Sequence, residues 1–274
     1  MTFPRVPRLD VELALRDLPV PLAYDGPCPG GQVGAVYVRR PDGRRLVLTR
    51  GPDVRAFLDV ARAGGIPAPR YELVHPPVVV QELLPGSPPG PSTLGAAVRS
   101  MAEVNRRARG LLAGRPDLPP LPLHLREDGP GFCLHEPLRV HDARTRRLLG
   151  QIEEVGAAVP EVLDGDDLVH TDFHTGNVLV DGTGRVTGVV DWDGAARGDG
   201  RFDLFTLRFD LERRAPELRV LLDELMAGDL APAPMAAACW AHMSLRQVDW
   251  SIRHHTAADV TAWLDIAERL RPPL

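Results

Sequence analysis

The chain contains 274 residues, which is enough to bury a sizeable core in one bilobal domain or two small ones. Its formal net charge of -5, without a basic stripe, argues against a nucleic-acid partner. The three cysteines are odd in number and widely spaced, which favours a reducing compartment over a disulfide framework. No apolar leader opens the sequence, and no apolar run is long enough to span a membrane. We therefore expect a cytoplasmic protein that contacts neither nucleic acid nor membrane.

The N-terminal part of the chain predicts a small sheet with one helix. Strands are expected at 35–40 and 45–50, joined by a turn at 41–44. A helix over 52–63 and a buried strand over 78–83 follow them. This part therefore has the elements of a compact β-rich lobe.

A glycine-rich segment with Gly31 and Gly34 precedes the first of these strands. Its backbone N–H groups are suited to bind phosphates. Glycines this close together, beside Pro27 and Pro29, also form ordinary turns, and both interpretations stay open.

The rest of the chain predicts mainly helices. Apolar residues recur at helical spacing over 92–111, 142–158, 202–214, 216–227, 232–255 and 257–271. Residues 116–137 are rich in proline and turn residues, so we expect an irregular surface over a cleft there.

The stretch 170–193, HTDFHTGNVLVDGTGRVTGVVDWD, carries the most specific pattern in the chain. Asn177 follows Asp172 by five positions, and Asp191 follows Asn177 by fourteen. Two β-rich runs flank turn residues at 181–184, which predicts a hairpin that brings Asn177 and Asp191 to one end. In protein kinases this spacing holds an Asp that accepts the hydroxyl proton, an Asn that binds one Mg²⁺ and an Asp that binds Mg²⁺ at the phosphates.

Phosphoryl transfer needs these residue types because negative charge spreads over the γ-phosphoryl group in a loose transition state. Carboxylate and amide oxygens are the ligands that Mg²⁺ prefers, and nucleotide phosphates and water complete its coordination. We therefore predict Asp172 as catalytic and Asn177 and Asp191 as Mg²⁺ ligands. His174 stands where protein kinases carry a Lys after the catalytic Asp, so we predict a catalytic contact with the γ-phosphate. The ordinary alternative is that these residues only cap a turn and end a strand.

With these motifs, the chain resembles the aminoglycoside phosphotransferase and choline kinase superfamily. The family usually reads His-Gly-Asp-x-His-x-x-Asn before a strand ending in Asp, and here Thr171 replaces the Gly. The segments 198–204 and 65–69 also look like family segments, and 81–86 looks like the hinge between lobes. The resemblance implies that backbone groups near Glu82 and Leu84 bind adenine.

The chain has no Lys, because all 32 of its basic residues are Arg. Kinases hold nucleotide phosphates with a Lys on the third strand, oriented by a Glu on the next helix. We predict that Arg50 takes this place as a permanent cation, although Thr49 aligns about as well and Arg50 has the alternative of a solvated strand end. The expected Glu is missing near Val54, and a high-GC genome accounts for the Arg bias without any functional selection.

The predicted fold is α+β and bilobal, like a protein kinase. Residues 1–82 would form a nucleotide-binding lobe with a small β-sheet, and 83–90 the hinge. Residues 91–274 would form a larger, mainly helical lobe with the catalytic hairpin 170–193 and the acceptor site.

The predicted function is Mg²⁺-dependent transfer of phosphate from ATP or GTP to a hydroxyl. The resemblance favours a small polar natural product as acceptor, such as an aminoglycoside or related antibiotic. Alternatives are a Ser/Thr kinase acting on a precursor peptide in a modified-peptide pathway, and a nucleotide-binding pseudokinase without turnover. Carboxylates after the metal motif would attract a cationic acceptor unless they pair with arginines, and they are Asp199, Asp203, Asp210, Glu212, Asp223 and Glu224.

Overall fold

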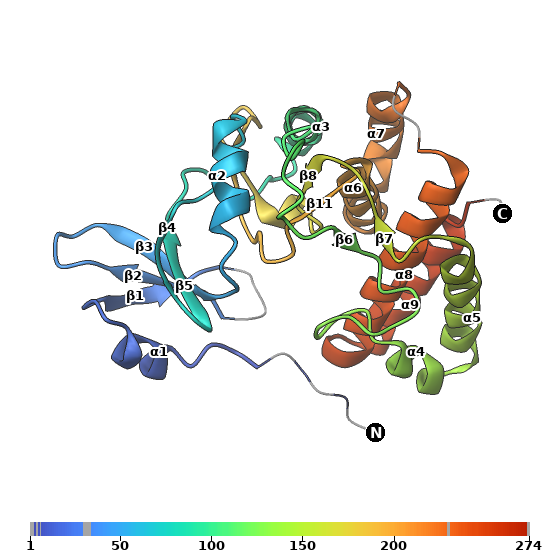
Figure 1. Cartoon of the computed structure of the whole chain (residues 1–274), viewed down its shortest axis with the longest axis horizontal. Helices are drawn as coiled ribbons and strands as arrows, with labels where there is room; N and C mark the ends of the chain where they lie inside the picture. Colours follow the sequence, from blue (N-terminus) through green and yellow to red (C-terminus); the bar gives the residue numbers. More distant parts are fainter. Residues whose placement is uncertain (1–2, 4, 6, 30–33, 229–230, 273–274) are drawn as a thin grey trace.

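The computed structural model describes residues 3, 5, 7–29, 34–228 and 231–272. They form two lobes, as the sequence predicts: a β-sheet lobe on the left of Figure 1 and a mainly helical lobe on the right. Among these residues, no helix combines the length and apolar character that a bilayer crossing requires.

The N-terminal lobe is a five-stranded antiparallel sheet with two helices. The strand order is β1-β2-β3-β5-β4. The predicted hairpin 35–50 is confirmed, with Gly43 at φ +85° in its turn, a backbone conformation that glycine adopts readily. The elements are β1 (Ala23–Pro27), β2 (Val36–Arg39), β3 (Arg45–Arg50), β4 (Tyr71–His75), β5 (Val78–Glu82), α1 (Val11–Asp17) and α2 (Arg55–Ala63).

The two faces of this sheet have different neighbours. Side chains alternate between faces along a strand, and Leu46 and Leu48 of β3 are buried with Ala14 of α1. Helix α2 packs instead into the core that it shares with the helical lobe. Thr49 therefore points to the face opposite α1, whereas Arg50 lies on the same face as Leu46 and Leu48.

The connection after β5, residues 83–90, runs along the predicted catalytic hairpin. Ser87 exchanges two backbone hydrogen bonds with Val180, at 3.1 and 2.8 Å. Gly86 has φ +107°, and a Cβ there would lie 2.4 Å from Oγ1 of Thr187. Only glycine fits this close approach, so the connection is fixed to the hairpin at this point.

The C-terminal lobe consists of helices around short strand pairs. The Asp142 side chain caps α5 by accepting from the Thr145 amide, which fixes its start near the predicted position. The helices are α3 (Leu94–Arg107), α4 (His135–His141), α5 (Ala143–Ala158), α6 (Arg201–Arg214), α7 (Arg219–Met226), α8 (Ala233–His254) and α9 (Ala257–Arg269). The strands are β6 (Leu121–Pro122), β7 (Val162–Leu163), β8 (Asp167–Val169), β9 (Val178–Val180), β10 (Val186–Val189) and β11 (Ala196–Gly198), and the 3₁₀ turns are η1 (Thr175–Asn177) and η2 (Pro216–Leu218).

Residues 116–137 differ from the expected surface over the cleft. Leu121, Leu123 and Leu125 are buried in the core of the helical lobe, where they pack with α5 and α8. Strand β6 in this segment pairs with β7. The proline content indicated an irregular path correctly, but alternating leucines make the segment part of the core.

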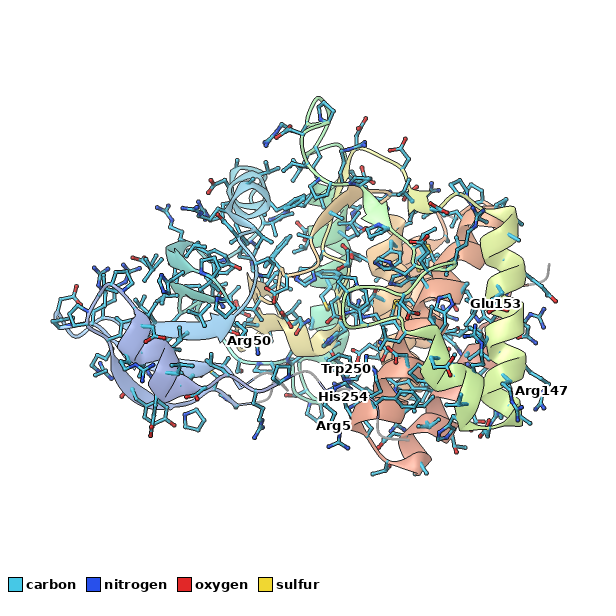
Figure 2. The ribbon with its side chains drawn as sticks, turned by 60° about the horizontal axis from the view of Figure 1, so that its bottom comes forward. Arg5, Arg50, Arg147, Glu153, Trp250 and His254 are labelled. Atoms are coloured by element: carbon cyan, nitrogen blue, oxygen red, sulfur yellow. The ribbon has the colours of Figure 1, made fainter. Side chains whose placement is uncertain are left out.

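The N-terminal segment reaches the helical lobe. Nε of Arg5 donates to the carbonyl of Arg253 at 2.8 Å. In Figure 2, Arg5 lies beside Trp250 and His254 of α8, whose rings stack with centroids 4.0 Å apart. This segment therefore connects α1 in the sheet lobe with the end of α8.

Candidate active site

The predicted hairpin forms and brings Asn177 and Asp191 together. Strands β9 and β10 pair antiparallel, and Oδ1 of Asp181 closes their turn by accepting from Thr183 and Arg185. At the open end, the Val190 amide donates to the Asn177 carbonyl at 2.9 Å. The local spacing thus places the two predicted metal ligands beside each other.

Asp172 lies next to Asn177 on the loop between β8 and η1. Nδ2 of Asn177 donates to the Asp172 carbonyl at 3.0 Å and to its Oδ2 at 3.3 Å. Nε2 of His174 is 3.6 Å from the same Oδ2. Nη2 of Arg246, from α8, is 3.0 Å from Oδ1. The loop therefore collects one carboxylate, one amide, one imidazole and one guanidinium.

The backbone of this loop is held by Asp203 at the start of α6. Its two carboxylate oxygens accept from the amides of His170 and Thr171, both at 2.9 Å. Thr171 has φ +70°, which is uncommon for a β-branched residue. The position where the family usually has Gly therefore requires a left-handed conformation, and Thr171 adopts it under restraint.

His170 braces the loop from inside. Its Nε2–H donates to the Val190 carbonyl at 2.9 Å, and its Nδ1 accepts from the Asp172 amide at 3.3 Å. This arrangement needs the neutral imidazole, because one ring nitrogen must donate and the other accept. Burial lowers the pKa of His170 to about 4, which keeps it neutral near pH 7.

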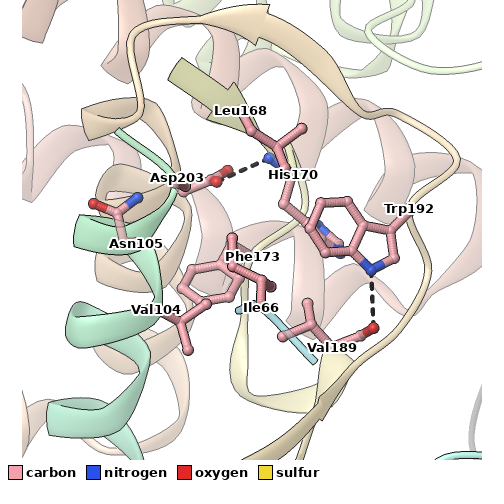
Figure 3. A pocket seen from close by; sticks show the side chains of 10 residues that line it. Ile66, Val104, Asn105, Leu168, His170, Phe173, Val189, Trp192 and Asp203 are labelled. Atoms are coloured by element: carbon pink, nitrogen blue, oxygen red, sulfur yellow. Dashed lines mark hydrogen bonds between the residues drawn. The ribbon is translucent and has the colours of Figure 1, made fainter. Parts of the chain in front are cut away.

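A small cavity lies behind this loop, between α3 and the Asp191-Trp192-Asp193 segment (Figure 3). Phe173 and Trp192 line it together with His170, and Nε1 of Trp192 donates to the Val189 carbonyl at 2.8 Å. Most of its lining is apolar and packs against the back of the loop. We assign it a packing role.

Comparison with known proteins identifies the family. Residues 27–239 match the phosphotransferase enzyme family. The chain belongs to this family. No curated protein matches the chain.

Solved structures share the fold of this phosphotransferase. A thermostable mutant of aminoglycoside phosphotransferase APH(4)-Ia, in complex with AMP-PNP and hygromycin B, has 20% identity, a TM-score of 0.66, and coverage of 96% of this chain and 98% of its own. Amicoumacin kinase hAmiN has 12% identity, a TM-score of 0.67, and coverage of 97% and 96%. Macrolide 2'-phosphotransferase MphH from Brachybacterium faecium has 19% identity, a TM-score of 0.53, and coverage of 96% and 98%.

The carboxylates of the phosphotransferase site differ in the direction in which their surroundings shift their pKa values. Burial disfavours ionisation of Asp172, yet the charges of Arg246 and His174 outweigh it and hold its pKa below the usual range. Burial among neighbouring atoms and the Asp172 charge raise the pKa of Asp191, although solvent reaches its side chain. Desolvation by neighbouring atoms and the Asp191 charge raise the pKa of Asp193 to about 7, although the residue is exposed to solvent. The site therefore has an ionised Asp172 beside two carboxylates whose charge a cation would stabilise.

His174 turns its ring toward the loop itself. Its Nδ1 accepts from the Gly176 amide at 3.0 Å, so its Nε2 carries the proton that faces Asp172. Burial opposes a charge on this ring, but the hydrogen bond and charge of Asp172 prevail and raise its pKa. Contact between His174 and the γ-phosphate stays a prediction.

The predicted nucleotide residues have mixed placements. Gly31 lies outside the described residues, and Gly34 has φ +84° beside Leu9 of the N-terminal segment. Arg50 donates from Nη1 to the Pro7 carbonyl at 3.3 Å and lies near the junction of the lobes (Figure 2). Because Thr49, not Arg50, lies on the face opposite α1, the strand gives no support to Arg50 as a replacement for Lys. Its phosphate role stays a prediction.

The predicted hinge residues lie at the end of β5 and just after it. The Glu82 amide donates to the Arg70 carbonyl at 2.8 Å, so it is already engaged. Leu84 packs beside β10, where a Cβ on Gly188 would lie 3.1 Å from it. Within the described part of the chain, the Leu84 amide has no hydrogen-bond acceptor. This group is therefore available to a ligand.

The acids that follow the metal motif are mostly paired with arginines. Asp210 accepts from the amide and hydroxyl of Thr175 and lies 2.6 Å from Nε of Arg214. Glu212 is buried among three arginines. The other pairs are Asp199 with Arg201 and Arg109, and Asp223 with Arg208. These acids brace the lobe and do not form the open acidic lining that a polycation would need.

Arg246 is the site residue that sequence reasoning missed. It lies on α8, far from the hairpin in sequence, and no motif surrounds it. An arginine on an amphipathic helix gives no local sign of its partner, so only the fold could reveal the contact with Asp172.

Proposed function

We propose that this phosphotransferase transfers the γ-phosphoryl group of ATP or GTP to a hydroxyl of a small polar natural product, with an aminoglycoside or related antibiotic as the favoured class. The observation that carries the proposal is the convergence of Asp172, Asn177 and Asp191 at one end of the hairpin. Loose phosphoryl transfer requires little more from a protein than a positioned base and metal-bound charge.

The residues fit a Mg²⁺ ion held by Asn177 and Asp191. The Asn177 amide nitrogen donates to Asp172, which leaves its oxygen as a ligand. Within the described residues, no hydrogen bond or ion pair engages the Asp191 carboxylate, and no cluster of three His, Cys, Asp or Glu could hold an ion alone. One carboxylate and one amide suit Mg²⁺, which takes its other ligands from phosphates and water. The ion would supply charge that neutralises the phosphates.

The chain's own groups account for the remaining chemistry. The ionised Asp172 accepts the proton of the acceptor hydroxyl as the hydroxyl oxygen bonds to the γ-phosphorus. The bond from that phosphorus to the β–γ bridging oxygen breaks, and the nucleoside diphosphate leaves. The Leu84 amide, which has no acceptor among the described residues, would donate to the nucleotide base at the hinge, and Glu82 would contribute through groups other than its amide. Further proposed contacts to phosphate are His174, Arg50, Gly31 and Gly34.

The acceptor class is proposed from similarity, because the charges of the site do not select it. One similar structure contains hygromycin B, and two others are named as an amicoumacin kinase and a macrolide 2'-phosphotransferase. Chemically different acceptors are therefore associated with this fold. Because the acids of α6 and α7 are mostly paired, attraction of a polycation by this surface does not support the aminoglycoside preference. The proposal requires only that the acceptor present a hydroxyl to Asp172.

A pseudokinase is the second candidate, and the chain favours it in one respect. Lys is absent, and Thr49 occupies the strand position that faces away from α1. A protein of this kind would bind the Mg²⁺–nucleotide without turnover. The precursor-peptide kinase differs only in its acceptor.

The decisive experiment combines binding and turnover. Thermal shift with Mg²⁺–ATP, Mg²⁺–GTP and a panel containing hygromycin B, kanamycin, erythromycin and amicoumacin identifies ligands that stabilise the fold. Mass spectrometry then shows whether a hit gains one phosphate. Nucleotide binding without phosphorylation of any panel member and without nucleotide hydrolysis would favour the pseudokinase. The absence of nucleotide binding would refute both candidates.

A further inference from the structure

Arg246 on α8 makes two contacts with the catalytic loop. Its Nη2 lies 3.0 Å from Oδ1 of Asp172, and its Nη1 donates to the Thr171 carbonyl at 2.7 Å. The side chains of Arg246 and Asp172 are only 19% and 24% exposed. A partly buried guanidinium with two partners restrains the geometry of both partners. An ion pair on the surface contributes little to stability by comparison.

The guanidinium has a third support from the segment before α4. Its central carbon lies 5.5 Å from the ring centroid of Phe132, within the range of a cation–π contact. Phe132 belongs to the segment whose leucines fill the helical-lobe core. Phe132 thus helps to hold Arg246 in place, and Arg246 in turn restrains the catalytic loop through its contacts with Thr171 and Asp172.

The contacts of Asp172 divide between its two oxygens. Among the described residues, Oδ1 contacts only Arg246, whereas Oδ2 has longer contacts, 3.3 Å from Asn177 and 3.6 Å from His174. Neither Asn177 nor His174 touches Oδ1, so among the described residues no other cation takes the place of Arg246. Other charged or titratable groups around the loop are His170, Asp191 and Asp203.

We propose that Arg246 is a positioning residue for phosphoryl transfer, which holds Oδ1 of Asp172 and the Thr171 carbonyl so that Oδ2 receives the proton of the acceptor hydroxyl. This inference rests on the proposed function. The left-handed Thr171 makes such a clamp useful, because a loop in a disfavoured conformation keeps its geometry only under several restraints. Asp203 restrains the amide side of Thr171, and Arg246 restrains its carbonyl side.

The kinetic test uses water as the acceptor, so that no substrate need be known. Arg246→Met removes the fork at similar length, and Arg246→Lys keeps the charge. Arg144→Met is the matched control, because Arg144 is also partly buried and joins α5 to Asp265 and Glu268 of α9. We expect Arg246→Met to lower kcat for ATP hydrolysis by about a hundredfold, with KM for Mg²⁺–ATP within about threefold. Arg246→Lys should recover part of the loss, and the control should match the wild type.

A spectroscopic measurement separates positioning from catalysis. In ¹³C-labelled protein, the Asp172 carboxyl resonance is assigned by its loss in Asp172→Asn. It should move in Arg246→Met and stay in place in Arg144→Met. A resonance unmoved by Arg246→Met, or a kcat within threefold of the wild type, overturns the proposal. A fall in kcat accompanied by an equal loss of nucleotide affinity also overturns it, because that pattern indicates general damage. If the resonance moves in Arg246→Met but the wild type itself turns over no ATP, the result refutes the proposed function instead, and with it the catalytic role of the contact.

Discussion

The Thr171 amide donates to Oδ1 of Asp203 at 2.9 Å while Thr171 holds a φ of +70°. The carboxylate thus stabilises a backbone conformation that a β-branched residue disfavours. Strain of this kind persists where surrounding contacts fix the chain, and here it lies beside the proposed catalytic base.

Thr171→Gly should therefore stabilise the protein. Relief of the left-handed conformation outweighs the extra entropy of glycine in the unfolded chain, with a net gain of about 1 kcal/mol. Thermal unfolding should show a rise in Tm of roughly 2–4 °C. Thr261→Gly in the exposed part of α9 is the control and should lower Tm, because glycine weakens a helix. An unchanged or lower Tm for Thr171→Gly would show that the loop is not strained at this residue.

Asp172→Asn should lower turnover at least about a hundredfold with little change in nucleotide affinity. The amide cannot accept the hydroxyl proton, but it keeps the size of the carboxylate. Steady-state kinetics give kcat, and calorimetry gives the Kd for Mg²⁺–ATP. Turnover close to that of the wild type would refute Asp172 as the base.

Asp191→Ala should abolish Mg²⁺-dependent nucleotide binding. The Asp191 carboxylate is the charged ligand in the proposed pair, and its raised pKa indicates a charge that a divalent cation would stabilise. Calorimetry with ATP in the presence and absence of Mg²⁺ measures the effect. Asp181→Ala, in the exposed turn of the same hairpin, controls for damage to the hairpin and should retain binding. Equal affinity of Asp191→Ala and wild type would place the metal elsewhere.

The site was predictable where its residues are close in sequence. Asp172, Asn177 and Asp191 lie within one hairpin, so spacing and turn residues fix their proximity. Arg246 was not predictable, because helix packing alone brings α8 to the loop. The choice between Thr49 and Arg50 also needed the structure, since it depends on which face of the sheet α1 covers.

The fold shows the same division between local and tertiary information. Helix α5 begins near the predicted position because its cap is a contact between near neighbours, Asp142 and Thr145. The leucines of residues 116–137 were assigned to the surface because proline and glycine dominate the local pattern. Their burial depends on α5 and α8, whose positions the local sequence does not specify.

His242 should make stability fall below neutral pH. Its Nδ1–H donates to the Leu123 carbonyl at 2.8 Å, and burial and the Arg246 charge lower its pKa from 6.5 to about 3. The unfolded chain takes up a proton near pH 6.5, whereas the folded chain does not until about pH 3. The contribution of His242 is therefore complete above pH 6.5 and decreases toward pH 3, by at most about 1.4 kcal/mol per pH unit.

His242→Asn tests this, because Asn retains a donor for the Leu123 carbonyl without titrating. Urea unfolding at pH 7.5 and 5.5 should show a smaller loss of stability for the variant than for the wild type. His141→Asn, at an exposed histidine on α4, should follow the wild type. Equal losses for His242→Asn and wild type would show that His242 is not buried in its neutral form.

The last prediction concerns charge on the acceptor side. Asp210 is engaged by Thr175 and Arg214, and Glu212 by three arginines, so their fields are largely cancelled at the surface. A polycation such as hygromycin B should therefore bind with an affinity that changes by less than about threefold between low and physiological salt, because screening has little net attraction to remove. Calorimetry at two salt concentrations measures this, and Arg214→Ala, which releases the charge of Asp210, should increase the salt dependence. A steep salt dependence in the wild type would show that an acidic surface recruits the acceptor after all.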